Sequence, residues 1–503
     1  MALSDAQVEQ IARMVAQQMG APIAPPRACG ESVSPRASAQ SASAASAGKM
    51  PAPPANAVPP IGSPGAFPTV DAAVAAAREA FVAFGKTPLA SRAKLIAAIR
   101  ASMLEHAEDL AKRAHAETGL GRWQDKLVKN RLVSSKTPGT EDLTPIASTG
   151  DRGLTLMERA PFGVIAAITP STNPTSTIIC NSIGMLAAGN TVVFNPHPSA
   201  KAVSIYNVAL INQAIASVGG PPNLITCVAE PTIESAQALM KHPGIRLLVV
   251  TGGPGVVQAA MGSGKRAICA GPGNPPVVVD ETADIELAGR DIVRGASFDN
   301  NVICTDEKEV FVVRSVADKL LEVMKRNGAV VLNAQQTRQL EAVIFKERRA
   351  APLQSIVDRD LIGRNASVIL AKIGMNVGDD VRLAVMDVEQ DHPLVWTEQL
   401  MPVMPVVRVA NCDEAIDLAV QAEGGRGHTA SMFSRNIEKL SRMARVINCS
   451  IFVKNGPCFA GLGEGGEGHT SFSIASPTGE GLTGPRAFSR ERRCVLVDHF
   501  RIV

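Results

Sequence analysis

Residues 162–194 read FGVIAAITPSTNPTSTIICNSIGMLAAGNTVVF, with two short apolar runs on either side of a helix-length segment. The runs at 162–168 and 190–194 have the length of buried strands, and the segment 176–188 between them ends at Gly189. Apolar strands joined by helices are typical of a parallel sheet that is covered on both faces. This stretch therefore predicts an α/β fold.

The same alternation continues along the chain. Helices are expected over 199–218 and near 232–241, and strands over 224–229 and 247–250. A second series of strands and helices runs from PVVVD at 276–280 to about residue 456. Upstream of the polar stretch 119–152, Thr87-Pro88 opens a helix whose apolar positions share one face: Leu95, Ile96, Ile99, Met103 and Leu110.

The composition excludes several classes of partner. The chain has 503 residues and a net charge of +3, so it lacks the basic surplus of a nucleic-acid-binding protein. No apolar run reaches the roughly 18 residues of a membrane span. The first 20 residues lack the basic start and apolar run of a secretory signal, and Asp5 and Glu9 argue against a mitochondrial presequence. We expect a cytoplasmic protein that binds neither nucleic acid nor membrane.

The N-terminus differs from the rest. Residues 4–7, SDAQ, form a capping-box pattern, and apolar residues then recur at helical spacing up to Met19. We expect an amphipathic helix over 1–20, followed by a Pro/Ala/Ser linker over 21–66 that is too poor in apolar groups to fold. Such a helix either docks on a partner, or is a plain tail or a helix packed back on its own protein, and the residues alone favour neither.

Three loops follow predicted strands and are candidates for a ligand site. They are TPSTNPT (169–175), NPHP (195–198) and TGGPG (251–255), and ligands bind at the carboxyl ends of strands in such sheets. The third loop leads into a helix start, where backbone N–H groups can receive a phosphate, but it is not a GxGxxG fingerprint. The Asn173 amide can donate to an oxyanion; from the loop alone, an Asx turn before Pro174 is the better interpretation.

Cys304 stands in GASFDNNVICTDEKEV (295–310), after Asn300 and Asn301. The chain has nine cysteines, and their odd number and wide spacing favour reduced thiols. Cys304 is either a buried core residue or a nucleophile at the mouth of a site. The sequence pairs no histidine with it, and no HExxH motif or Cys/His cluster predicts a metal site.

Taken together, these segments resemble the aldehyde dehydrogenase superfamily, and more narrowly the CoA-acylating aldehyde dehydrogenases of bacterial microcompartments, which act on propionaldehyde or acetaldehyde. The resemblance spans about 67–503. It rests on ITPSTNPTST, VVFNPHPSA, VTGGPGVV, AGPGNPPVVVD, SFDNNVICTDEKEV, EQLMPVMPVVRV, HTASMFSRN and VKNGPCFAGLGEGGEGHTSFSIASPTGEG.

The resemblance implies a Rossmann-like NAD-binding domain, an αβ catalytic domain and a small oligomerisation element. The implied boundaries are 67–275 for the first domain, with 140–160 contributing to oligomerisation, and 276–456 for the second. Residues 457–503 are then expected to return to the cofactor domain and to end in an oligomerisation strand. The family implies a homo-oligomer, either a dimer or a tetramer.

The resemblance also implies roles for single residues. Cys304 becomes the nucleophile, and the Asn173 amide with the Cys304 backbone N–H becomes the oxyanion site. NAD and coenzyme A are the implied cofactor and co-substrate. The residues expected to contact the cofactor are Thr169, Pro170, Asn195, Pro196, His197, Thr251, Gly252, Gly253, Gly271 and Glu398. Of these, Glu398 matches the family's carboxylate for the nicotinamide ribose.

Two departures from the wider superfamily bear on the reaction. Ala270 stands where hydrolytic members carry a glutamate base, and Asn195 replaces their ribose-binding lysine. A cysteine-bound acyl group hydrolyses quickly only if a nearby group activates water, so the thioester is expected to persist until CoA attacks it. The alternatives are a hydrolytic aldehyde dehydrogenase, an acyl phosphate reductase and a non-catalytic microcompartment binder.

The N-terminal segment is similar to the encapsulation peptides of microcompartment enzymes. The resemblance therefore implies that helix 1–20 docks on a shell protein and that the protein lies in the microcompartment lumen. Phe459 and the segment TSFSIA favour propionaldehyde over acetaldehyde, by likeness alone.

Overall fold

The computed structural model describes residues 63–503. The predicted helix over 1–20 and residues 21–62 of the predicted linker lie outside the described residues. Residues 63–66, assigned to the linker by composition, instead form a turn and the first residue of strand β1 (Ala66–Phe67). Ala66 pairs in parallel with Cys227, and this added strand buries the end of the segment. Within 63–503, no helix is both long and apolar enough to cross a bilayer.

The first sheet has six parallel strands in the order β1-β6-β5-β4-β7-β8. Its strands after β1 are β4 (Val164–Ile168), β5 (Thr191–Asn195), β6 (Ile225–Val228), β7 (Leu247–Thr251) and β8 (Ala267–Ala270). The chain runs outward from β4 through β5 to β6 and then returns to β7 on the other side of β4. Strand order therefore reverses between β4 and β7, where α/β sheets bind ligands.

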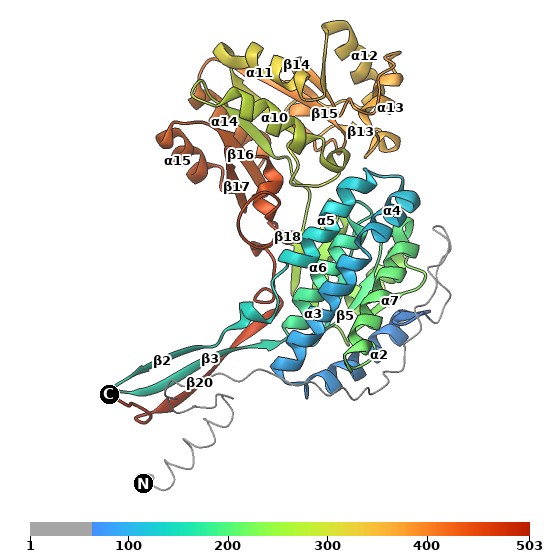
Figure 1. Cartoon of the computed structure of the whole chain (residues 1–503), viewed down its shortest axis with the longest axis vertical. Coiled ribbons are helices and arrows are strands. Elements are labelled where there is room, and N and C mark those ends of the chain that lie inside the picture. The colour runs from blue at the N-terminus through green and yellow to red at the C-terminus, as the bar shows by residue number, and fades with distance from the viewer. Residues whose placement is uncertain (1–62) are drawn as a thin grey trace, which may run out of the picture. The chain divides into compact units, whose positions relative to one another are not determined.

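Helices cover both faces of this sheet because its strands are apolar on both faces. One face packs against α2 (Val70–Phe84), α8 (Ile233–Lys241) and α9 (Pro254–Met261). The other packs against α3 (Leu89–Glu105), α4 (Ala107–Thr118), α5 (Trp123–Lys136), α6 (Pro174–Ala187) and α7 (Lys201–Ser217). Alternate residues of β4 serve the two faces: Val164 and Ala166 face α8, and Ile165 and Ala167 face α6. Figure 1 shows α3, α5 and α6 side by side.

The second sheet has seven parallel strands in the order β11-β14-β15-β10-β9-β16-β17. They are β9 (Pro276–Val279), β10 (Glu309–Val313), β11 (Ala329–Leu332), β14 (Leu383–Val388), β15 (Val403–Val409), β16 (Thr429–Phe433) and β17 (Ile451–Lys454). Helices α10 (Ile285–Ala296) and α11 (Arg314–Arg326) pack on one face. The other carries α14 (Cys412–Glu423), α15 (Ile437–Val446), α12 (Ala334–Ile344) and α13 (Ala366–Ala371).

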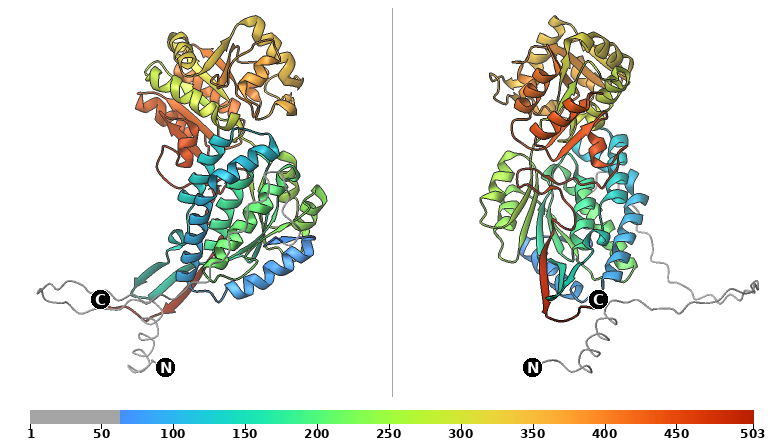
Figure 2. Two further views of the ribbon diagram at one scale, coloured as in Figure 1. Left: turned by 45° about the vertical axis from the view of Figure 1, so that its right-hand side comes forward. Right: turned by 90° about the vertical axis from the view of Figure 1, so that its left-hand side faces the viewer.

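A third, antiparallel sheet joins β2 (Ile146–Gly150), β3 (Gly153–Pro161) and β20 (Ser489–Val497). Figures 1 and 2 show the teal strands and the red one side by side. Before β20, the chain returns from the second sheet to the first. The Cys269 N–H donates to Thr478 Oγ1 at 3.0 Å, and Asn190 Nδ2 donates to the Phe488 carbonyl at 2.8 Å.

The predicted α/β class is confirmed, and the expected strands and helices between 162 and 250 form within a few residues of their predicted bounds. Two expectations need correction. The helix predicted through Leu110 ends at Glu105, because His106 leaves helical geometry and its ring bonds back to the Ser102 carbonyl at 2.8 Å. The stretch 119–152, whose polar pattern predicts no helix, contains α5 and also β2.

Candidate active site

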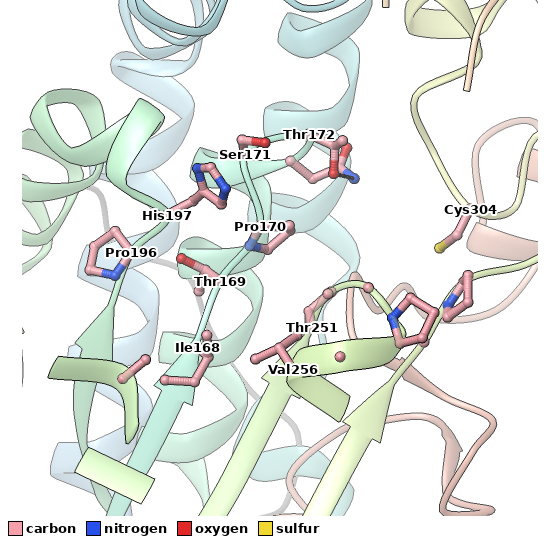
Figure 3. A pocket seen from close by; sticks show the side chains of 18 of the residues that line it. Ile168, Thr169, Pro170, Ser171, Thr172, Pro196, His197, Thr251, Val256 and Cys304 are labelled. Atoms are coloured by element: carbon pink, nitrogen blue, oxygen red, sulfur yellow. Dashed lines mark hydrogen bonds between the residues drawn. The ribbon is translucent and has the colours of Figure 1, made fainter. Parts of the chain in front are cut away.

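A cavity of about 950 Å³ lies at the carboxyl ends of β4, β5 and β7. Every residue predicted for the site lines it: Cys304, Asn173, Thr169, Pro170, Asn195, Pro196, His197, Thr251, Gly252, Gly253, Gly271 and Glu398. Figure 3 shows Cys304 across the cavity from Pro196, His197 and the loop after β4. Of the described cysteines, Cys304 is the one that lines the cavity, so it is not simply a core residue.

A left-handed turn brings Cys304 to the cavity. Asp299, Asn300 and Asn301, in the short helix Phe298–Asn301, have φ of 46°, 56° and 65°. Asn and Asp tolerate this region best among residues with a side chain, because their short polar groups bond locally. Asn301 Nδ2 donates to the carbonyls of Ala296 and Glu307 at 2.8 and 2.9 Å, which fixes the turn.

Buried charges hold the segment after the nucleophile. Residues 306–309, Asp-Glu-Lys-Glu, are fully buried although their sequence looks like a surface run. Lys308 Nζ donates to Asn301 Oδ1 at 2.5 Å, to the Asn301 carbonyl at 3.0 Å and to the Ile303 carbonyl at 3.1 Å. A buried ammonium requires such partners. These three hydrogen bonds from Lys308 therefore stabilise the turn.

The surroundings of Cys304 oppose its ionisation. Burial raises the pKa of the Cys304 thiol to about 12, and the carboxylates of Glu398 and Asp306 act in the same direction. Lys308 and the Cys304 backbone N–H lower the pKa but do not outweigh burial. The thiolate is the nucleophilic form of cysteine, so the site at rest holds a thiol that has yet to lose its proton.

The Asn173 side chain does not form the Asx turn that the loop alone favours. Asn173 is the residue before α6, yet it makes no side-chain bond to the helix backbone. Its Oδ1 instead accepts a 2.6 Å bond from the buried Lys129 ammonium, and its Nδ2 donates to Thr172 Oγ1 at 3.2 Å. An ammonium only donates, so the Asn173 atom that faces Lys129 must be Oδ1. The Asn173 NH₂ group therefore points away from Lys129.

The loops after β4 and β5 form one wall of the cavity. Thr169 is buried, and its Oγ1 has no partner among the described residues, so it is free for a ligand. Asn195 Oδ1 accepts from Ser235 Oγ at 2.6 Å at the start of α8. His197 Nδ1 accepts from Ser199 N, and burial lowers the pKa of its ring. This wall therefore presents neutral groups.

The loop after β7 leads into α9, whose first turn begins with Gly253-Pro254. A Cβ at Gly253 or Gly255 would meet open space, so the helix N-terminus is uncovered on that side. Backbone N–H groups at such an end attract phosphate. Thr251 Oγ1 is already bonded to Ser473 Oγ at 3.0 Å, so its hydroxyl serves mainly to fix the loop.

Glu398 is the one carboxylate among the residues that line the cavity. Its Oε1 accepts from the Gly273 N–H at 3.1 Å. Burial raises the pKa of Glu398, while Lys308 and that N–H lower it in part. Ala270, at the end of β8, is buried and does not line the cavity. The Glu398 carboxylate, an unpartnered Thr169 hydroxyl and an open helix N-terminus together fit a dinucleotide.

The profile of the aldehyde dehydrogenase family matches residues 65–477. The acetylating acetaldehyde dehydrogenase EutE of Salmonella typhimurium is 55% identical over 442 residues, which are 87% of this chain and 94% of that protein. The chain belongs to the aldehyde dehydrogenase family. Another relative, the CoA-propanoylating propanal dehydrogenase of Citrobacter freundii, is 47% identical to this aldehyde dehydrogenase over 439 residues, 87% of this chain and 94% of that one.

Solved structures also resemble this aldehyde dehydrogenase. A Rhodopseudomonas palustris propionaldehyde dehydrogenase with bound CoA and an acylated cysteine has a TM-score of 0.83 at 49% identity, covering 86% of this chain and 98% of that one. A propionaldehyde dehydrogenase from the fucose utilisation microcompartment of Clostridium phytofermentans has a TM-score of 0.84 at 46% identity, covering 88% and 100%.

Several residues at the site of this aldehyde dehydrogenase are not predicted from its sequence. Lys129 lies on α5, in the stretch taken as polar, and Lys308 lies in an apparently exposed charge run. His428 stands in the quoted stretch HTASMFSRN but received no role. Its ring lies against Gly273, where a Cβ would come within 3.1 Å of the ring and would also meet the Cys304 carbonyl. Burial lowers the pKa of His428 to about 3, and its Nε2 has no partner within 63–503.

Phe459, which favoured propionaldehyde by likeness, is buried and stacks on Phe298 with ring centroids 5.1 Å apart. It does not line the cavity, whereas Phe472 and Ile474 of the TSFSIA segment do. The apolar residues that line the cavity include Val302, Ile303, Leu400, Leu462, Phe472 and Ile474.

Proposed function

We propose that this protein is a CoA-acylating aldehyde dehydrogenase, which converts a short aliphatic aldehyde, CoA and NAD⁺ into acyl-CoA and NADH. The observation that carries the proposal is a cysteine in a cavity whose one lining carboxylate is bonded to a backbone N–H. The names of the relatives, acetylating and CoA-propanoylating, support the same reaction.

In the first half-reaction, Cys304 loses its proton to solvent water and its sulfur forms a bond to the aldehyde carbon. The carbonyl π electrons move to oxygen, and the Asn173 NH₂ and the Cys304 N–H hold the resulting oxyanion. NAD⁺, when bound, supplies the hydride acceptor. The oxyanion electrons then re-form the C=O bond while the C–H bond of the aldehyde carbon breaks and its hydrogen leaves as hydride to that acceptor, which gives a thioester on Cys304. We assign the phosphate contacts to the loop Thr251–Gly253 and the nicotinamide ribose to Glu398.

In the second half-reaction, the CoA thiolate attacks the thioester and forms a new carbon–sulfur bond. The bond to Cys304 breaks, and Cys304 leaves as the thiolate. Water is a much poorer nucleophile than a thiolate and needs a base, and Ala270 supplies none. The thioester is therefore attacked by CoA faster than by water, because position 270 lacks the carboxylate that would activate water.

The test is NADH formation with and without CoA. We expect fast turnover with CoA and turnover at least about tenfold slower without it. Equal rates would favour a hydrolytic enzyme, and NADH formation that requires phosphate in place of CoA would favour an acyl phosphate reductase. Cys304→Ala should abolish NADH formation and the acyl adduct seen by mass spectrometry; an unchanged rate would mean that Cys304 is not the nucleophile. A wild type that forms no NADH at all would favour the non-catalytic alternative. A series of two- to four-carbon aldehydes ranks acetaldehyde against propionaldehyde.

We further propose that residues 67–275 and 276–456 are the cofactor and catalytic domains, and that 457–503 returns to the first. Support comes from the sheets, since β4 to β8 fall within the first range and β9 to β17 within the second. The bonds of Cys269 and Asn190 to Thr478 and Phe488 support the return. Residues 140–160 and the C-terminal strand share the third sheet, which we propose as the element for a dimer or tetramer.

We propose that the N-terminal 20 residues dock on a shell protein and place the enzyme in a microcompartment lumen. The support is the helical pattern of the sequence and the microcompartment source of a similar structure. Deleting residues 1–20 should leave CoA-dependent turnover within about twofold and abolish co-localisation with shells. Co-localisation of the shortened protein with shells would contradict the proposal. The control is the full-length protein.

A further inference from the structure

Three ionic side chains are buried beside the proposed oxyanion site. Lys126 and Lys129 lie on α5 and are each 2% exposed, and Asp299 is 0% exposed. Lys126 Nζ lies 2.9 Å from Asp299 Oδ2, and Lys129 Nζ bonds to the same oxygen. Burying charges costs several kcal/mol per ion before pairing, so such a cluster must be closely held.

The two ammonium groups differ in their remaining partners. Lys126 Nζ donates to the Thr172 carbonyl at 3.3 Å, whereas Lys129 Nζ donates to Asn173 Oδ1 at 2.6 Å. Only Lys129 therefore fixes the amide orientation. With Oδ1 bonded to a cation, the amide NH₂ also becomes a stronger donor, because the ammonium withdraws electron density from the amide.

Asp299 joins this contact to the nucleophile. It opens the left-handed turn that leads to Cys304, and its Oδ1 accepts from the Arg122 N–H at 2.7 Å. Gly121 leaves room for this carboxylate, since a Cβ there would overlap Asp299 Oδ1. One ion cluster thus links α5, the loop after β4 and the turn before Cys304.

We propose that Lys129 is a positioning residue for acylation, which acts by holding the Asn173 amide with its NH₂ toward the aldehyde oxygen. Asp299 holds Lys129 in turn. Without Lys129 the amide can rotate and present Oδ1, which repels an oxyanion. This proposal rests on the proposed function, because it assigns Asn173 to the acylation step.

The test compares Lys129→Met with Asn173→Ala and with the double variant. Removal of one oxyanion donor costs about 10²–10³ in kcat. We expect each single variant to lose on that order in the aldehyde-dependent kcat, and the double variant to lose no more than Asn173→Ala alone. Losses that multiply in the double variant would overturn the proposal, since they would show that Lys129 acts independently of Asn173.

Alkylation of Cys304 by iodoacetamide distinguishes a lost orientation of the Asn173 amide from a displaced Cys304 turn. That reaction displaces iodide and forms no oxyanion, so its rate should stay within about twofold in Lys129→Met. A parallel fall in alkylation would mean that the Cys304 turn has moved and would also overturn the proposal. Lys126→Met is the matched control: it removes a cation from the same cluster but leaves the Lys129–Asn173 bond, and should cost less than about tenfold.

The fold should survive Lys129→Met because Asp299 keeps Lys126 and the Arg122 N–H. If that variant does not fold by circular dichroism, Lys129→Leu, which likewise has no hydrogen-bond donor, takes its place in the same cycle, with the same requirement for non-additivity. A failure of the proposed function is distinct: there the wild type itself would lack CoA-dependent NADH formation. If the wild type shows CoA-dependent turnover and Lys129→Met is equally active, only this inference is overturned.

Discussion

At the scale of single residues, the Cys304 thiol occupies a place that disfavours its reactive form. Its pKa of about 12 lies above that of a free cysteine, about 8.5. In the enzyme without cofactor, the thiolate fraction should therefore rise about tenfold per pH unit from pH 7 to 10. Iodoacetamide alkylation of Cys304 should rise with the same slope and without a plateau. A plateau between pH 7 and 9 would contradict the raised pKa.

Glu398 gives a second prediction at this scale, because its carboxylate raises the Cys304 pKa. Removing a negative charge lowers the pKa of a neighbouring thiol and increases the thiolate fraction. Glu398→Gln should therefore speed alkylation of the cofactor-free enzyme at pH 8, by roughly tenfold for one pKa unit. Aldehyde turnover should fall at the same time if Glu398 holds the nicotinamide ribose. Slower alkylation would contradict the sign of this interaction.

At the scale of elements, the left-handed turn at 299–301 decides where the nucleophile points. Asn301→Ala removes bonds to two carbonyls and to Lys308, and it places an alanine at φ 65°. We expect a loss of about 2–4 kcal/mol in the free energy of unfolding, measured by urea denaturation. Asn301→Gly loses the same bonds without the steric cost of a Cβ and should be no less stable than Asn301→Ala. The reverse order would show that backbone conformation is not the limiting factor.

At the scale of the whole molecule, β20 pairs with β3 on one edge and exposes Val495 and Val497, which are 53% and 60% exposed. Both side chains lie on the same face, because residues two apart share a face of a strand. If this sheet builds the oligomer, the replacements Val495→Lys and Val497→Lys together should shift the mass by light scattering toward the 52.6 kDa of one chain. An unchanged multiple of that mass would assign the interface elsewhere. The control for folding is an unchanged far-UV circular dichroism spectrum of the double variant.

The family, the α/β class and the loops of the site follow from the sequence because they depend on local pattern. Apolar runs such as 162–168 form strands wherever they are buried, and polar loops after parallel strands meet at one sheet edge. Asn173 stands in such a loop, so its place at this sheet edge was predictable. Cys304 instead follows a helix and precedes strand β10, so its place beside Asn173 was predicted by the family resemblance alone. The structure of the last linker residues was not predictable, because Ala66 becomes a strand residue only by pairing with Cys227.

The sequence by itself determined the strands and helices between residues 162 and 250 and which loops carry the nucleophile and the glycines of the cofactor site. Only the tertiary structure decided which charges are buried. Helix α5 was missed because it turns polar side chains inward, so its inner face lacks the apolar period that marks a helix. Lys129 reaches Asn173 across 44 positions and Asp299 across 170. Contacts over such distances depend on packing and desolvation, which the order of residues along the chain does not encode locally.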